Sequence, residues 1–73
     1  MSELPPTRLT PGLFFEYRGI IVRAAEPARR GRYVLGFAAV FITATAADGR
    51  EVTAIFDPAA TVTLREGFTP PAG

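Results

Sequence analysis

The sequence predicts an all-β fold, and three features of the chain carry this prediction. The longest uncharged stretch, Tyr33 to Ala47, is rich in β-branched and aromatic residues, which pack well on a pleated sheet and lose side-chain freedom in a helix. Shorter segments on either side alternate apolar and polar residues with the period of two that a half-buried strand requires. Glycines, prolines and the Asp48-Gly49 pair separate these segments, as turns do.

Two interpretations of the uncharged stretch compete with a strand: a transmembrane helix and a buried helix. As a helix its fifteen residues would span about 22 Å, which is too short for a hydrocarbon core of about 30 Å. Arg32 and Asp48 bound the stretch on its two sides, so we expect no transmembrane segment. A buried helix over residues 37–47 stays open, because five of these residues are alanine. That helix would change the fold class to α+β.

A bend is expected within the central strand. A straight strand of this length would run about 50 Å, which is too long for a domain of 73 residues. The inward-facing apolar positions also change parity near Ala38–Ala39, as they do at a β-bulge. Gly36 is a second candidate for the kink, because a glycine within a strand often marks a bend. Before the change the expected inward residues are Leu35 and Phe37, and after it they are Val40, Ile42 and Ala44.

The first third of the chain is predicted to hold an arm and two strand segments. Residues 1–12 contain three prolines and no periodicity, so we interpret them as an extended, mostly mobile arm. Strands are predicted from Leu13 to Arg18 and from Ile20 to Ala25. With only Gly19 between them, one bent strand remains the alternative, and the choice of Phe14 or Phe15 as the buried ring stays open. The expected inward residues are Leu13, Phe15 and Tyr17, then Ile20, Val22 and Ala24.

The segments on either side of the central stretch are predicted to be a loop and a hairpin. Glu26 to Arg32 is expected to form a loop, because Pro27 lacks a ladder donor and Gly31 is conformationally permissive. Asp48-Gly49 is a strong hairpin signal. It leads into a return strand from Glu51 to Asp57, whose expected inward residues are Val52, Ala54 and Phe56.

The C-terminal part is predicted to hold a helical turn and one more strand. In the run DPAA, residues 57–60, Asp57 suits a helix cap and Pro58 suits the first helical position. The last strand is expected from Thr61 to Glu66 with Val62 and Leu64 inward, and Gly67 ends it.

This order of elements resembles an SH3-like small β-barrel. The resemblance covers roughly residues 13–66 and rests on the order of elements and on the DPAA turn before TVTLRE. It implies a five-stranded barrel at residues 13–67, between an N-terminal arm at 1–12 and a C-terminal tail at 68–73. It implies no function, because the acidic loop and paired aromatics of peptide-binding SH3 domains are not evident. The alternative, an oligonucleotide-binding barrel, usually needs a longer chain and an internal helix.

Composition restricts the class of protein. A 73-residue chain forms one domain that buries only about 60% of its surface. It contains no cysteine, and so no disulfide supports it. We therefore expect oligomerisation. All eight basic residues are arginine, which is typical of a GC-rich bacterial or phage genome, and the net charge is only +1. The N-terminus lacks a secretory pattern, so the expected location is cytoplasmic.

The sequence predicts no catalytic site. It has no histidine and no cysteine, the residues that most often act as general base, nucleophile or metal ligand. Asp48 is explained by its turn and Asp57 by its cap, and the other carboxylates lie at loops or outward strand positions. No phosphate loop or metal-ligand spacing is present. We expect a non-enzymatic chain with no cofactor and no metal.

Two sets of residues are candidate binding surfaces. One set consists of Arg29, Arg30, Arg32 and Tyr33. It suggests a nucleic-acid site, because arginines bind phosphates bidentately and an adjacent aromatic ring can stack on a base. The interpretation we favour for this set is a solvated loop. The other set is apolar and has the outward parity, which suggests a protein interface: Phe14, Ile21, Phe41 and Ile55.

The predicted function is that of a small binding or accessory module that self-associates through its outward apolar sheet face. Its expected partner is a second copy of the chain or another protein, and we expect no contact with a membrane. The alternatives are a nucleic-acid-binding regulator that uses the loop from Arg29 to Arg32, and a subunit of an oligomeric enzyme.

Overall fold

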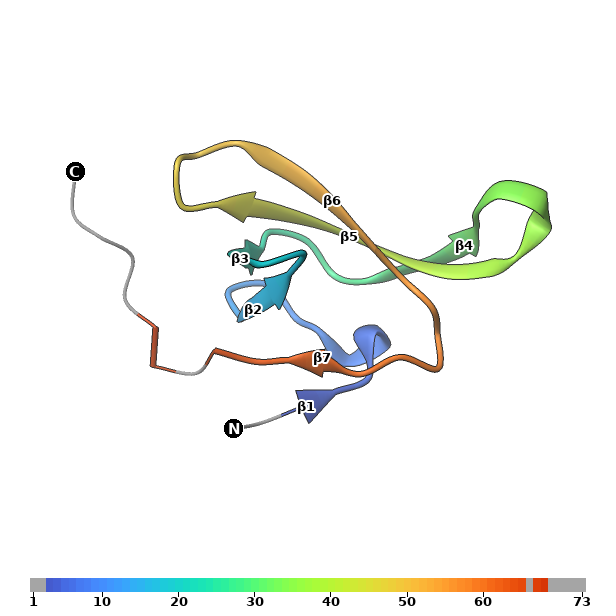
Figure 1. Ribbon diagram of the computed structural model, residues 1–73, viewed down its shortest axis with the longest axis horizontal. Helices are drawn as coiled ribbons and strands as arrows, with labels where there is room; N and C mark the ends of the chain where they lie inside the picture. Colours follow the sequence, from blue (N-terminus) through green and yellow to red (C-terminus); the bar gives the residue numbers. More distant parts are fainter. Residues whose placement is uncertain (1–2, 66, 69–73) are drawn as a thin grey trace.

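The computed structural model describes residues 3–65 and 67–68, and in this part of the chain it is an all-β protein (Figure 1). This confirms the predicted all-β class, but not the predicted five-stranded barrel. The strands are β1 (Glu3–Leu4), β2 (Phe14–Tyr17), β3 (Ile20–Ala24), β4 (Arg29–Arg32), β5 (Ala38–Ala46), β6 (Glu51–Phe56) and β7 (Val62–Thr63). Two short 3-10 turns accompany them, η1 (Pro6–Arg8) and η2 (Val34–Gly36).

The strands form two antiparallel sheets. The larger one has the order β2-β3-β5-β4, with β6 paired along the other edge of β5. The smaller one pairs β1 with β7. An isolated bridge between Phe15 and Leu64 brings β7 alongside β2. Within the described residues neither sheet closes into a barrel.

The sheets enclose one apolar core on their inner side. The predicted inward parity is confirmed at the buried positions of β2, β3, β5 and β6, whereas all four residues of β4 are exposed. Within these four core-lining strands, Ile20 was expected inward and is 39% exposed, since it follows the β2–β3 turn directly. The core members are Leu9, Phe15, Val22, Ala24, Val40, Ile42, Ala44, Ala46, Ala54, Val62 and Leu64.

Residues 13–25 form two strands joined by a tight hairpin. Arg18 and Gly19 both have positive φ, 51° and 82°, as the central residues of a type I′ turn do. Phe15 is fully buried and Phe14 half-buried, which resolves the choice that the sequence left open. On the same strand, the ring of Tyr17 packs edge-on against Phe56 of β6.

The central stretch is a strand only from Ala38 onward. This excludes the helix at residues 37–47. It also corrects the prediction of a bent strand from Tyr33, because residues 33–37 reverse the chain into a hairpin. The segment predicted as a loop, Arg29 to Arg32, is β4 and pairs with β5 along residues 38–41. Leu35 and Phe37, predicted inward, are exposed, because no other element covers the reversal.

The turn at Asp48-Gly49 forms as predicted. Gly49 has a φ of 90°. Asp48 accepts hydrogen bonds from the Arg50 backbone N–H at 3.0 Å and from its Nε at 2.6 Å. The backbone donor and then the guanidinium lower the pKa of the exposed Asp48 carboxyl below its usual 3.8. A carboxylate with a lowered pKa stabilises the folded turn above that value, and the stabilisation is lost as the pH falls through the folded pKa.

The turn before β7 is tighter than the predicted helical turn. The Ala60 N–H donates to the Asp57 carbonyl at 2.9 Å, and the Ala59 N–H donates to Asp57 Oδ1 at 2.7 Å. Asp57 therefore binds the N–H groups that follow it, as a cap does, but the four residues make a β-turn and the predicted helical turn is wrong. After this turn Val62 and Leu64 are buried, as the alternation predicted, although β7 itself comprises only Val62 and Thr63 of the strand expected from Thr61 to Glu66.

The N-terminal segment contributes to the core. Leu9 is only 2% exposed, Pro6 is also fully buried, and β1 pairs with β7. The sequence-based interpretation of residues 1–12 as a mostly mobile arm did not anticipate this burial. Most of the predicted C-terminal tail lies outside the described residues, apart from Phe68.

Candidate binding surfaces

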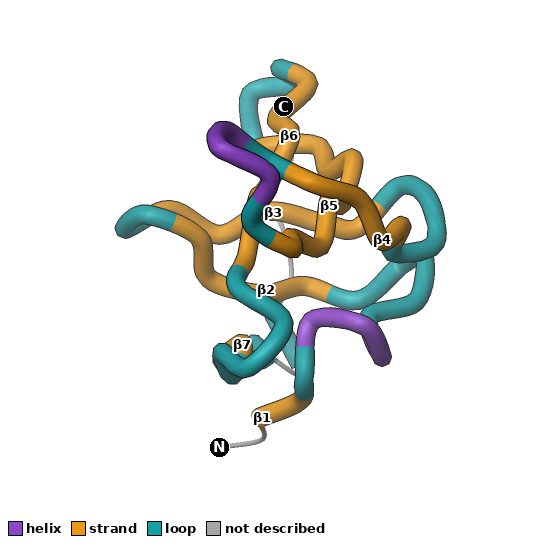
Figure 2. The backbone as a smooth tube through the Cα atoms, turned by 90° about the vertical axis from the view of Figure 1, so that its right-hand side faces the viewer, coloured by secondary structure: helices purple, strands orange, loops and turns teal. Residues whose placement is uncertain are grey.

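The hairpin formed by β4, η2 and β5 extends beyond the rest of the molecule. Figure 1 shows it at one end of the long axis, and Figure 2 looks onto that end. β5 is nine residues long. Its second half is flanked by β3 and β6, whereas its first residues, Ala38 and Ala39, pair only with β4. The hairpin tip, residues 33–37, therefore has no neighbouring strand.

The hairpin tip carries the most exposed large apolar side chains in the described part of the chain. Leu35 is 92% exposed, Phe37 68% and Tyr33 51%. The Tyr33 ring has one close aromatic neighbour, Phe41, with ring centroids 6.4 Å apart. Because these side chains bury little surface within the molecule, they add little to the stability of the fold.

The backbone of the hairpin tip is closed by hydrogen bonds. The Tyr33 N–H donates to the Phe37 carbonyl at 2.8 Å, and the Gly36 N–H donates to the Tyr33 carbonyl at 3.1 Å. Leu35 has φ 60° and ψ 18°, the left-handed conformation that glycine or asparagine adopts at lower cost. A leucine at this position has both a strained backbone and a hydrated side chain.

Three arginines, Arg29, Arg30 and Arg32, lie on β4 directly before the hairpin tip. Side chains alternate along a strand, so Arg29 lies on one face of the hairpin and Arg30 and Arg32 lie on the other. Arg32 Nη1 donates to the Gly36 carbonyl at 2.9 Å, which holds one guanidinium against the tip. The sequence has no acidic residue between Glu26 and Asp48.

The structure thus brings the predicted nucleic-acid set together on one hairpin, although on both of its faces. That set is Arg29, Arg30, Arg32 and Tyr33. The sequence analysis missed Leu35 and Phe37, because it counted their hydrophobicity as evidence of burial. The signal that could have found them is Gly36, which the sequence analysis interpreted as a kink within a strand, whereas it lies in the reversal of the chain.

The predicted interface residues lie on one face of the larger sheet. Each one neighbours a core residue along its strand, so its side chain lies on the opposite side of the sheet. We call this side the outer face, and it is marked by Phe14, Ile21, Phe41 and Ile55. Its two apolar ends are separated by polar side chains, among them Arg23, Thr43, Thr45 and Thr53.

One apolar end of the outer face is formed by aligned partners on β5 and β6, Phe41 and Ile55. The Phe41 ring also lies over Gly31 of β4, where an added Cβ would come within 2.8 Å of the ring. Gly31 therefore gives the ring the space it occupies. The Ile55 backbone N–H donates to the Tyr17 hydroxyl at 3.3 Å, so Tyr17 covers part of the free edge of β6.

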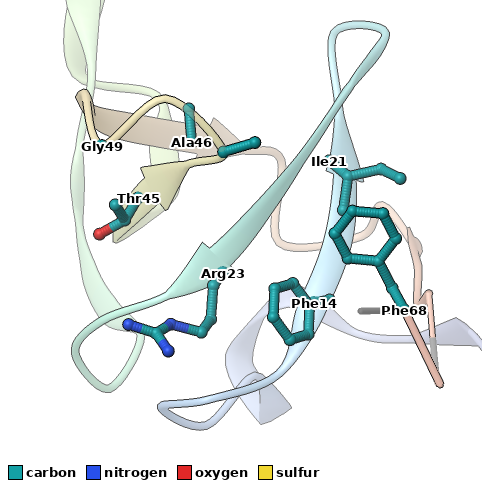
Figure 3. Close-up of a pocket in the computed structure, with 8 residues that line it drawn as sticks. Phe14, Ile21, Arg23, Thr45, Ala46, Gly49 and Phe68 are labelled. Atoms are coloured by element: carbon teal, nitrogen blue, oxygen red, sulfur yellow. The ribbon is translucent and has the colours of Figure 1, made fainter. Parts of the chain in front are cut away.

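The other apolar end borders a shallow groove of about 240 Å³ (Figure 3). Phe68 lies edge-on against Phe14, with ring centroids 5.2 Å apart, and Ile21 lines the same groove. Contact with Phe68 leaves this end of the outer face less accessible than the hairpin tip. Figure 3 shows that the side chains meet from β2, β3 and the segment after β7.

Charged side chains of the described residues form few contacts with one another. The ion pairs found are Arg50 with Asp48, and Arg65 with Glu16 at 3.7 Å, all of them substantially exposed. Among residues 3–65 and 67–68, no three carboxylates lie close enough together to hold a metal ion. No helix in this part of the chain is long and apolar enough to cross a membrane.

Comparisons with protein-family models, with curated proteins and with solved structures found no match to this chain.

Proposed function

We propose that this chain is a non-enzymatic binding module and that the hairpin of β4 and β5 is its binding element. We also propose that its strands follow an SH3-like arrangement that is open between β6 and the smaller sheet. The β5–β6 hairpin, the turn at Asp57 and the position of β7 beside β2 support this arrangement.

The observation that carries the proposal is the exposure of Leu35 and Phe37. Exposed apolar side chains scattered one by one are ordinary, but these two lie within three residues on a projecting hairpin. Leu35 also occupies the left-handed region without burying its side chain. Strain of this kind is typical of functional positions. A partner that covers the hairpin tip would account for both the exposed apolar side chains and the strained backbone at Leu35.

The proposal is tested by photocrosslinking in cells. A photoreactive amino acid replaces Phe37 in one variant and Ala59, on the exposed turn before β7, in the control. We expect adducts from position 37 that are absent from position 59, because only the hairpin tip meets a partner. Equal adduct yields from both positions, or no adduct from either, would contradict the proposal.

A second candidate function is self-association through the outer face, and the shared face of Phe41 and Ile55 favours it. We expect the substitution Ile55→Glu to reduce the solution mass measured by light scattering over a dilution series, because a buried unpaired charge opposes assembly. Ala59→Glu, which adds the same charge on an exposed turn, is the control. A wild-type chain that is monomeric at every concentration, or an unchanged mass for Ile55→Glu, would contradict self-association.

A further inference from the structure

We propose that the partner of the hairpin tip is an anionic lipid surface, into which Leu35 and Phe37 insert while the arginines bind headgroup phosphates. This inference rests on the proposed function of the hairpin. It departs from the sequence-based expectation of no membrane partner. That expectation considered only membrane-spanning segments and the net charge of the whole chain, and neither describes a local, surface-bound contact.

The first argument is the chemistry of the hairpin tip. Its most exposed side chain, Leu35, is aliphatic. It gains free energy by entering a hydrocarbon phase, whereas it can neither stack on a base nor hydrogen-bond to one. Phe37 adds a second apolar group, and Tyr33 is amphipathic, as side chains at membrane interfaces often are. This combination favours lipid over nucleic acid.

The second argument is the position of the charges. Lipid headgroups surround an inserted hairpin on all sides, so cations on both of its faces can reach phosphates. The hairpin has Arg29 on one face and Arg30 and Arg32 on the other. Arg29 and Arg32 lie three positions apart along the strand, or about 10 Å. The headgroup layer of one leaflet is about 5–8 Å deep, and long arginine stems extend the reach of the guanidinium groups.

The third argument is that part of the backbone of the hairpin tip is already hydrogen-bonded before it leaves water. Unsatisfied backbone groups are costly in a lipid environment. Here the Tyr33 N–H, the Gly36 N–H and the Gly36 carbonyl all have partners within the hairpin. These bonds persist on insertion, so they lower the desolvation cost of the tip.

The test is sedimentation of the full chain with vesicles, either of neutral phosphatidylcholine or of phosphatidylcholine mixed with phosphatidylserine. We expect binding to the mixed vesicles that weakens with added salt, and weaker binding to neutral ones by about fivefold for each arginine that meets the surface. Leu35→Asn should reduce the partition coefficient by about tenfold or more. Because asparagine tolerates the left-handed conformation, the unfolding midpoint of the Leu35→Asn variant should stay at the wild-type value or rise.

Ile20→Asn is the matched control, since Ile20 is a partly exposed aliphatic residue on β3, away from the hairpin. It should bind vesicles as the wild type does. The inference is overturned if the wild type fails to bind mixed vesicles, or if Leu35→Asn binds as tightly as the wild type. Binding of a labelled DNA duplex without binding of vesicles also overturns it, in favour of nucleic acid. In these cases adducts from position 37 to protein or nucleic acid would still uphold the proposed function of the hairpin.

Discussion

Replacing Phe15 with alanine is expected to lower the free energy of unfolding by about 3–5 kcal/mol. The Phe15 side chain is fully buried and contributes to the packing between the two sheets. Its backbone pairs with Val22 and bridges to Leu64, and its ring centroid lies 6.1 Å from that of Phe56. Since small domains are stable by only about 5–15 kcal/mol, this loss is a large fraction of the total stability.

Phe14→Ala is the matched control for this prediction. It removes the same side chain from the next residue, but Phe14 is half-buried and its aromatic neighbour is Phe68. We expect it to lower the free energy of unfolding by about 1 kcal/mol. Urea titrations followed by circular dichroism would measure both variants. Equal losses would show that the register of β2 is wrong.

Replacing Leu9 with alanine is expected to cost about 2–5 kcal/mol, although Leu9 lies in the segment interpreted from sequence as a mobile arm. The reason is its burial, because Leu9 packs into the core with only 2% of its surface exposed. The same substitution at Leu35, which is 92% exposed, should change the free energy of unfolding by less than about 0.5 kcal/mol.

This pair of leucine substitutions separates a residue that the fold requires from one whose side chain the fold does not require. Denaturant midpoints measured side by side would settle the comparison. If Leu9→Ala is as stable as Leu35→Ala, the N-terminal segment does not belong to the folded domain.

The sequence predicted the strands well where one face of a strand meets the core. There the alternation of apolar and polar residues follows directly from burial, as in β6, where Ala54 is buried and Thr53 exposed. The Asp48-Gly49 hairpin was equally predictable, because the conformational preferences of a turn are local. The cap at Asp57 belongs to the same class of local signals.

The same reasoning failed where strands leave the core. Leu35 and Phe37 were expected inward because hydrophobicity was treated as evidence of burial, but the hairpin tip extends past the elements that could cover it. Arg29 to Arg32 shows no apolar alternation and was expected to be a loop. It forms β4 because the β5 backbone offers it hydrogen-bonding partners, and no property of its side chains reveals this.

Leu9 illustrates a third limit. Periodicity needs several residues of one element, and an isolated apolar residue among prolines has no pattern by which its burial could be recognised. The candidate site was predictable in part for a related reason. The arginine cluster and Tyr33 are close together in sequence, whereas the position of the hairpin tip beside them depends on where the chain reverses.

The most direct test of the account is the fluorescence of a single tryptophan at the hairpin tip. The chain has no tryptophan, so Phe37→Trp gives a reporter without background, and its ring keeps the amphipathic character suited to an interface. We predict that its emission shifts to shorter wavelength when anionic vesicles are added and stays unchanged with neutral vesicles at the same lipid concentration. An emission maximum that remains at its value in water with anionic vesicles would contradict the claim that the hairpin tip enters a lipid surface.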